Sequence, residues 1–281
     1  MDDKKEKRWF NAVLPFLIPV LVLILWQLVS MGGGAKASLM PSPVKVLQTF
    51  VGMVESGELL RHALISTNRA LSGFLVGGMI GLVLGLINGL WSLAERLTDS
   101  SVQMLRNIPH LALIPLILLW FGIGEESKLV MVSLGVFFPI YLNTFHGIRS
   151  IDPGLIEMGR VYGLKGFALY RNVLFPGALA SILVGVRYSL GIMWLTLIVA
   201  ETVSAKSGIG YMAMNAREFL QMDVIVLSIL IYALLGKLSD SLAKVAERQF
   251  LKWHPNYNKP ARKGGLRLVR KSYPAANSTA S

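Results

Sequence analysis

The residues best suited to chemistry form a polar segment, Glu157-Met158-Gly159-Arg160-Val161-Tyr162-Gly163, between two strongly apolar runs. Asp152 suits the N-cap of a helix, Pro153 its first turn and Gly163 its end. These signals predict a helix of about ten residues, or three turns. Its composition favours recognition of another protein over catalysis.

The predicted helix has two different surfaces. Leu155, Met158 and Tyr162 fall at helical spacing on one face, while Glu157 and Arg160 point elsewhere. The segment can therefore present an apolar and a charged surface to a partner. An ordinary loop helix without a partner is the alternative.

Two arginines, Arg106 and Arg187, lie within apolar runs. Charges in such places normally face the protein interior or a water-filled cavity. Either guanidinium could bind an anion through two parallel hydrogen bonds, or could reach the lipid headgroups or a helix end instead. Trp194 follows Arg187 in the same run, and Glu201 lies at its outer end. Both are further candidates for a solute path, although packing is the better-supported role for Trp194.

A second candidate for the path is the sequence Arg106-Asn107-Ile108-Pro109-His110, which Pro115 follows. The two prolines remove backbone donors, so they are expected to break the helix twice. Broken helices in membranes often border solute paths. His110 therefore joins the candidates, although a kink that serves packing alone explains the prolines equally well.

Composition predicts a polytopic membrane protein. The 281 residues are 53% hydrophobic and 16% charged, with a mean hydropathy of +0.56. The chain has no cysteine, and its four histidines lack the spacing of metal ligands, so neither a metal site nor a cofactor is expected. The net charge of +12 comes mostly from the termini and loops. The topology of a membrane protein explains this distribution better than binding to nucleic acid does.

The predicted fold is all-α, with about six membrane-spanning helices, since each span needs about 20 apolar residues. The six runs are residues 12–31, 70–91, 102–121, 129–148, 181–200 and 224–240. The first follows a basic terminus, as a signal peptide does, but its length and lack of a cleavage site favour an uncleaved helix.

The distribution of Lys and Arg predicts the orientation. If the N-terminus is cytoplasmic, 19 of these residues lie inside and seven outside, and the positive side of a membrane protein is normally the cytoplasmic one. Both termini and the Glu157 segment are then cytoplasmic.

The organisation follows from these spans. The segments are a basic N-terminus at 1–11, a first span with an external segment at 12–61, a core at 62–245 with a cytoplasmic loop at 149–178, and a basic tail at 246–281.

In the second span, Gly77, Gly81, Gly85 and Gly89 recur at four-residue intervals. Such a ridge lets another helix approach closely, within the subunit or at a dimer seam.

The Glu157 segment and the following Val173-Leu174-Phe175-Pro176 resemble the signature E-A-A-x3-G-x9-I-x-L-P. With this motif the membrane subunits of ABC importers bind their ATPase. The positions in register are Glu157, Gly163 and Pro176. The departures are Met158 and Gly159 in place of two alanines, and Val173 and Phe175 in place of Ile and Leu.

The resemblance extends over residues 41–240, to the permeases of the nitrate, sulfonate and taurine branch of ABC importers. Within it, four stretches resemble the aliphatic sulfonate subunit: residues 105–115, 120–124, 200–211 and 215–219. Taurine relatives usually carry Pro-x-Pro-Pro near the first of these stretches.

The resemblance implies a type I ABC-importer permease in a bacterial inner membrane that works by alternating access. It implies docking of two ATPase subunits on Glu157, Met158, Gly159, Gly163 and Pro176, with ATP and Mg²⁺ on those partners. It also implies a second permease copy, most simply identical, and an external binding protein that delivers an organic anion. Aliphatic sulfonates are the expected substrates, with nitrate or taurine as alternatives.

Other classes are less well supported. The chain lacks a Walker A loop and the hydrolase motifs Gly-x-Ser-x-Gly and His-Glu-x-x-His, so it is not expected to be an enzyme. A secondary transporter would favour internal repeats or a pair of buried acids, and a channel would need a selectivity filter. None of these features stands out.

Overall fold

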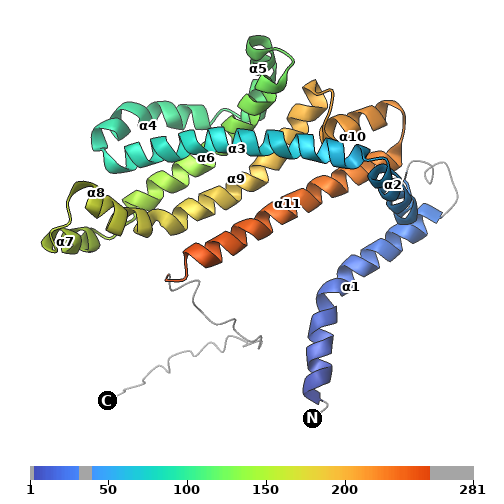
Figure 1. The fold of residues 1–281 in the computed structure, drawn as a ribbon, viewed down its shortest axis with the longest axis horizontal. Coiled ribbons are helices and arrows are strands. Elements are labelled where there is room, and N and C mark those ends of the chain that lie inside the picture. The colour runs from blue at the N-terminus through green and yellow to red at the C-terminus, as the bar shows by residue number, and fades with distance from the viewer. Residues whose placement is uncertain (1–2, 32–39, 254–281) are drawn as a thin grey trace, which may run out of the picture.

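The computed structural model describes residues 3–31 and 40–253, and within these ranges every regular element is helical (Figure 1). The predicted tail beyond residue 253 lies outside the described residues. The helices are α1 (Asp3–Met31), α2 (Pro43–Glu55), α3 (Glu58–Leu90), α4 (Ser92–Arg106), α5 (Ile114–Phe121), α6 (Glu125–Arg149), α7 (Pro153–Val161), α8 (Gly166–Leu169), α9 (Phe175–Ser204), α10 (Ile209–Glu218) and α11 (Met222–Phe250). A 3-10 turn, His110–Leu113, precedes α5, and a π-helical turn, Tyr170–Leu174, precedes α9.

The glycine ridge of α3 packs against α6 within the subunit. A Cβ atom at Gly77 would collide with the backbone of Ser133, and one at Gly81 would lie 2.6 Å from the carbonyl oxygen of Phe137. The two backbones can approach this closely only because the ridge has no side chains. Of the two interpretations of the ridge, packing inside the subunit is confirmed.

Four helices of the described part are long and apolar enough to cross a membrane: α3, α6, the stretch Gly166–Ser204 and α11. The predicted span at 102–121 is a broken one, because Ser100–Arg106 and His110–Phe121 meet at 84°. The first predicted span, residues 12–31, falls within α1. A count of six spans therefore stays a prediction.

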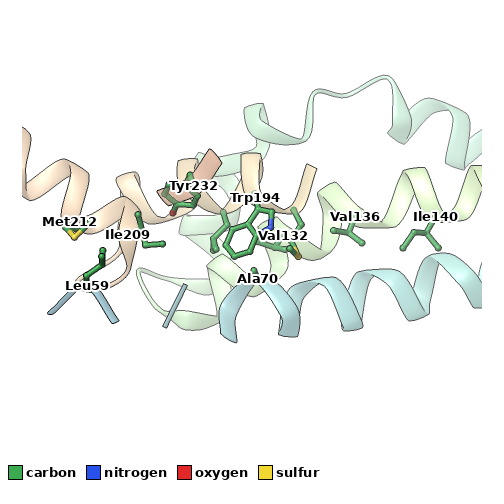
Figure 2. Close-up of a cluster of buried hydrophobic side chains, with 11 residues drawn as sticks. Leu59, Ala70, Val132, Val136, Ile140, Trp194, Ile209, Met212 and Tyr232 are labelled. Atoms are coloured by element: carbon green, nitrogen blue, oxygen red, sulfur yellow. The ribbon is translucent and has the colours of Figure 1, made fainter. Parts of the chain in front are cut away.

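The largest hydrophobic core lies where α3, α6, α9 and α11 meet α10 (Figure 2). Val132 of α6 and Leu197 of α9 are fully buried there. Trp194 is also buried, its ring meets that of Tyr232 edge to face, and its indole N–H donates to Ser239 Oγ at 2.8 Å. The core thus fixes α11 against α9, which positions the charged residues of both helices.

Candidate functional site

The Glu157 segment forms α7, a helix of nine residues, as its local signals predict. The Asp152 carboxylate accepts a hydrogen bond from the Gly154 N–H at 2.8 Å, and Pro153 occupies the first helical turn. The side chain of Asp152 thus satisfies one of the free N–H groups at the helix start.

The end of α7 requires a glycine. Gly163 has φ +82°, in the left-handed region, and the Leu164 N–H donates to the Gly159 carbonyl at 3.0 Å. This is the glycine-terminated helix end known as the Schellman motif. Gly159 is buried, and a Cβ atom there would lie 2.9 Å from Leu169, so the small residue lets α7 pack against α8.

The outward surface of α7 combines apolar and charged side chains. Leu155 and Met158 are about half exposed, and Tyr162 is 80% exposed. Glu157 is exposed as well and makes no hydrogen bond or ion pair within the described ranges. An accessible acidic side chain beside exposed apolar ones is suited to protein docking.

Helix α7 lies at one end of the helix bundle (Figure 1). It follows the end of α6, at the opposite end of the bundle from Glu125, where α6 begins (Figure 1). Pro176 lies in the first turn of α9 and is half-buried. The π-helical turn Tyr170–Leu174 joins α8 directly to α9.

Arg187 of α9 has acidic partners on α11. Its Nε donates to Asp240 Oδ1 at 2.7 Å, and its Nη1 lies 3.6 Å from Glu247 Oε2. Lys244 also pairs with Asp240, at 2.7 Å. No acidic residue lies at helical spacing from Arg187 within α9 itself, because Asp240 and Glu247 come from another helix.

Arg187 borders a groove of about 530 Å³ between α9 and α11. Tyr188, Gly191 and Gly236 also line it, and a Cβ atom at either glycine would meet open space. The groove is large enough for a small anion. The ion pairs of Arg187 nevertheless give it a role in joining two helices, whether or not a solute passes.

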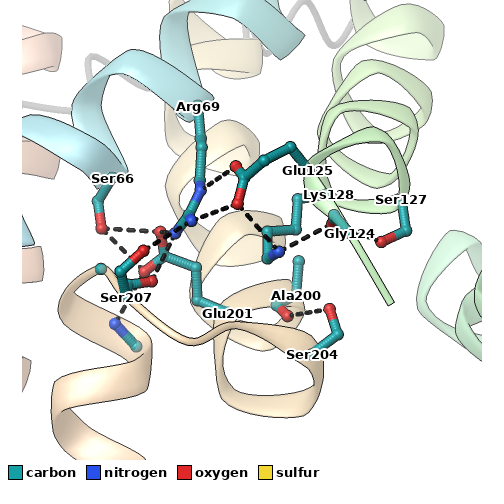
Figure 3. Close-up of polar contacts among 12 residues, drawn as sticks. Ser66, Arg69, Gly124, Glu125, Ser127, Lys128, Ala200, Glu201, Ser204 and Ser207 are labelled. Carbon is teal, nitrogen blue, oxygen red and sulfur yellow. Dashed lines mark hydrogen bonds and ion pairs between the residues drawn. The ribbon is translucent and has the colours of Figure 1, made fainter. Parts of the chain in front are cut away.

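Glu201 is buried near the C-terminal end of α9, in the network shown in Figure 3. Its carboxylate accepts hydrogen bonds from Ser66 Oγ at 2.8 Å, Arg69 Nη1 at 2.9 Å and Tyr232 Oη at 2.9 Å. The Gly210 N–H donates to it at 2.9 Å. With four donors around it, Glu201 is a structural anchor, and its assignment to a solute path gains no support.

Arg69 extends this network to α6. Its Nη2 donates to Glu125 Oε1 at 2.6 Å, and its Nη1 donates to the Ser207 carbonyl at 2.5 Å (Figure 3). Gly208 has φ +108°, and a side chain there would collide with the Glu201 carboxylate. The glycines that follow α9 in the sequence therefore allow the loop to close over the acid.

The break after α4 has a different environment. His110 Nε2 lies 3.1 Å from Thr196 Oγ1 of α9, which joins the 3-10 turn to the bundle. Arg106 and Asn107 are exposed, and their side chains make no hydrogen bond or ion pair within the described part. The Asn107 backbone N–H donates to the Met104 carbonyl at 3.2 Å. Of the predicted path residues, Arg106 is therefore the accessible cation, whereas Arg187 and Glu201 have internal partners.

Sequence reasoning missed several partners. The sequence places Arg69 among the seven positive residues outside the membrane, and it does not connect Asp240 or Glu247 with Arg187. A hydrophobic run shows that its charges need partners, but it does not show which helix supplies them. No group of residues able to hold a metal ion occurs in the part of the chain that the structure describes.

Comparison with known proteins supports one family. Residues 77–252 match the model described as "Binding-protein-dependent transport system inner membrane component". A protein of Escherichia coli strain K12 named as an aliphatic sulfonates transport permease is 58% identical over 90% of this chain and 96% of its own length. A protein of Bacillus subtilis strain 168 with the same name is 43% identical over 90% of this chain and 91% of its own.

A solved structure supports the fold. The crystal structure of an amino acid ABC transporter matches 71% of this chain and 98% of its own chain, with a TM-score of 0.55 and 20% identity. The family model covers more than half of the sequence, and the two relatives cover nearly all of it. The chain therefore belongs to the family of inner membrane components of binding-protein-dependent transport systems.

Proposed function

We propose that this chain is the membrane-spanning permease subunit of an ATP-driven importer of aliphatic sulfonates. As a member of its family it is a transport subunit and not an enzyme. The proposal for the substrate rests on the identity of 58% to the Escherichia coli relative, which is named for aliphatic sulfonates and aligns over nearly its whole length.

The proposed ATPase contact is the outward surface of α7. Glu157 and Met158 would touch the partner directly, because both are exposed. Gly159 and Gly163 would hold the shape of the helix, and Pro176 would begin the long helix that responds. ATP and Mg²⁺ would bind to two copies of the partner, which has to be cytoplasmic.

The remaining partners follow from the same assignment. A second, identical copy of this chain would complete the path, and an external binding protein would deliver the anion. The chain would lie in a bacterial inner membrane with both termini cytoplasmic. This orientation is supported by the excess of Lys and Arg on the α7 side.

The substrate is tested by uptake in bacterial cells that lack their own sulfonate permease. Cells that express this chain with its ATPase and binding protein should accumulate a labelled alkanesulfonate. Excess unlabelled alkanesulfonate should abolish the uptake, and equal concentrations of taurine or nitrate should compete weakly. If taurine or nitrate is taken up and the alkanesulfonate is not, the substrate assignment is wrong.

A further inference from the structure

The break between α4 and α5 is exposed at the depth of the membrane core. His110 contacts Thr196, which lies eight residues, or about 12 Å, from the end of α9 at Ser204. Gly135 lies beside the same contact, ten residues, or about 15 Å, from the start of α6. Since α6 has 25 residues and is about 37 Å long, the contact lies near its middle.

Several polar groups at this depth lack partners. Arg106, Asn107, Ile108 and Pro109 are all exposed. Within the described residues the carbonyls of Asn107 and Ile108 accept no hydrogen bond, and the side chains of Arg106 and Asn107 make none. The break thus presents a cation, an amide and two carbonyls to its surroundings.

Hydrocarbon cannot surround such a segment. Irregular backbone at membrane depth occurs only where protein covers it or where it lines a water-filled cavity. The single subunit does not cover residues 106–109, so the covering has to come from water, from a solute or from another copy of the chain.

We infer that residues 106–110 line a water-filled path between two copies of this chain, with Arg106 and Asn107 facing the transported organic anion. The inference rests on the proposed function for the nature of the solute. Arg106 supplies a charge and a planar set of donors, and the Asn107 amide can donate as well. His110 holds the segment against α9 through Thr196, so it is a positioning residue.

The absence of native cysteine allows a direct test. Single-cysteine chains with Asn107→Cys or Ile108→Cys, assembled with the ATPase in lipid vesicles, are treated with an anionic, water-soluble methanethiosulfonate reagent. Leu75→Cys is the matched control, because Leu75 is 62% exposed and lies in the middle of the regular helix α3. Only assemblies recovered in normal amounts with the ATPase are compared.

Both cysteines at the break should react at least about tenfold faster than Leu75→Cys, because apolar surroundings suppress the reactive thiolate. If both are as slow as the control, no water-filled path passes the break and the inference is wrong. This measurement needs no knowledge of the substrate.

Two further readouts address the anion. Adding Arg106→Gln to Asn107→Cys should lower the ratio of anionic to cationic reagent rates roughly sevenfold, as expected for one charge about 7 Å away in water. An unchanged ratio would remove Arg106 from the path. Alkanesulfonate should slow the labelling of the cysteine. If it does not, the anion does not pass the break. Sulfonate uptake by the same vesicles tests the proposed function separately.

Discussion

Gly77 of α3 lies so close to the backbone of Ser133 on α6 that a Cβ atom at residue 77 has no room. This contact sits at the centre of the packing between α3 and α6, the most extensive between two helices in the described part of the chain. It explains why glycine recurs along one face of α3. Helix packing in a membrane depends on such close approach, because lipid and protein interiors are equally apolar.

Gly77→Ala should therefore destabilise the isolated subunit in detergent. Overpacking costs about 1–3 kcal/mol, and here it outweighs the gain of up to about 1 kcal/mol that alanine gives a helix. Gly236→Ala is the control, since a Cβ atom there meets open space. The thermal unfolding midpoint should fall for the first variant only. Equal midpoints would show that α3 and α6 leave room for a side chain at residue 77.

Removing the Glu201 carboxylate should prevent the subunit from folding or severely reduce the amount of folded subunit. Glu201→Ala leaves the Arg69 guanidinium and the Tyr232 hydroxyl without their buried acceptor, which should cost about 3–5 kcal/mol. Glu126→Ala, at an exposed acid of α6, should have little effect. Recovery of folded subunit from membranes measures both variants, and normal recovery of Glu201→Ala would contradict the anchoring role.

Replacing Arg187 should reduce assembly of the subunit more than it reduces affinity for the solute. Arg187→Gln leaves the buried Glu247 without its nearest cation, so recovery of the subunit should fall. A double-mutant cycle with Asp240→Asn tests the pair directly. The coupling should be about 0.5–3 kcal/mol, as for residues in contact. Strictly additive effects, together with a raised half-saturation concentration for uptake, would instead place Arg187 in the path.

The orientation predicts which positions an impermeant thiol reagent reaches in whole cells. Ser150 is exposed beside α7, and Ser56 is exposed between α2 and α3 at the opposite end of the bundle. Ser150→Cys should resist the reagent until the cells are opened, and Ser56→Cys should react at once. The reverse pattern would place α7 outside the cell, where no ATPase could reach it.

Local signals in the sequence predicted local structure well. The Asp152 cap, Pro153 and Gly163 gave the bounds of α7 almost to the residue, since each acts through its own backbone neighbourhood. The glycine ridge likewise predicted close helix packing.

Contacts between distant segments could not be predicted in this way. Arg187 meets Asp240 across 53 residues, and Arg69 meets Glu201 across 132. These pairs depend on which helices become neighbours, and hydrophobic periodicity shows only that a helix has an apolar face. The 84° bend at 106–110 was anticipated from its prolines, but the exposure of the segment became evident only in the folded subunit.

If α7 couples this permease to ATP hydrolysis on a partner, substrate uptake should depend both on ATP and on Glu157. The most direct measurement is sulfonate uptake into proteoliposomes that contain the chain, its ATPase and the external binding protein, with ATP present or absent on the ATPase side. Glu157→Ala is compared with Glu55→Ala, an exposed acid of α2. Uptake should require ATP, and Glu157→Ala alone should lose both uptake and retention of the ATPase in a pull-down, with normal recovery of the folded subunit. Uptake without ATP, or full uptake and full ATPase retention by Glu157→Ala, would contradict this coupling.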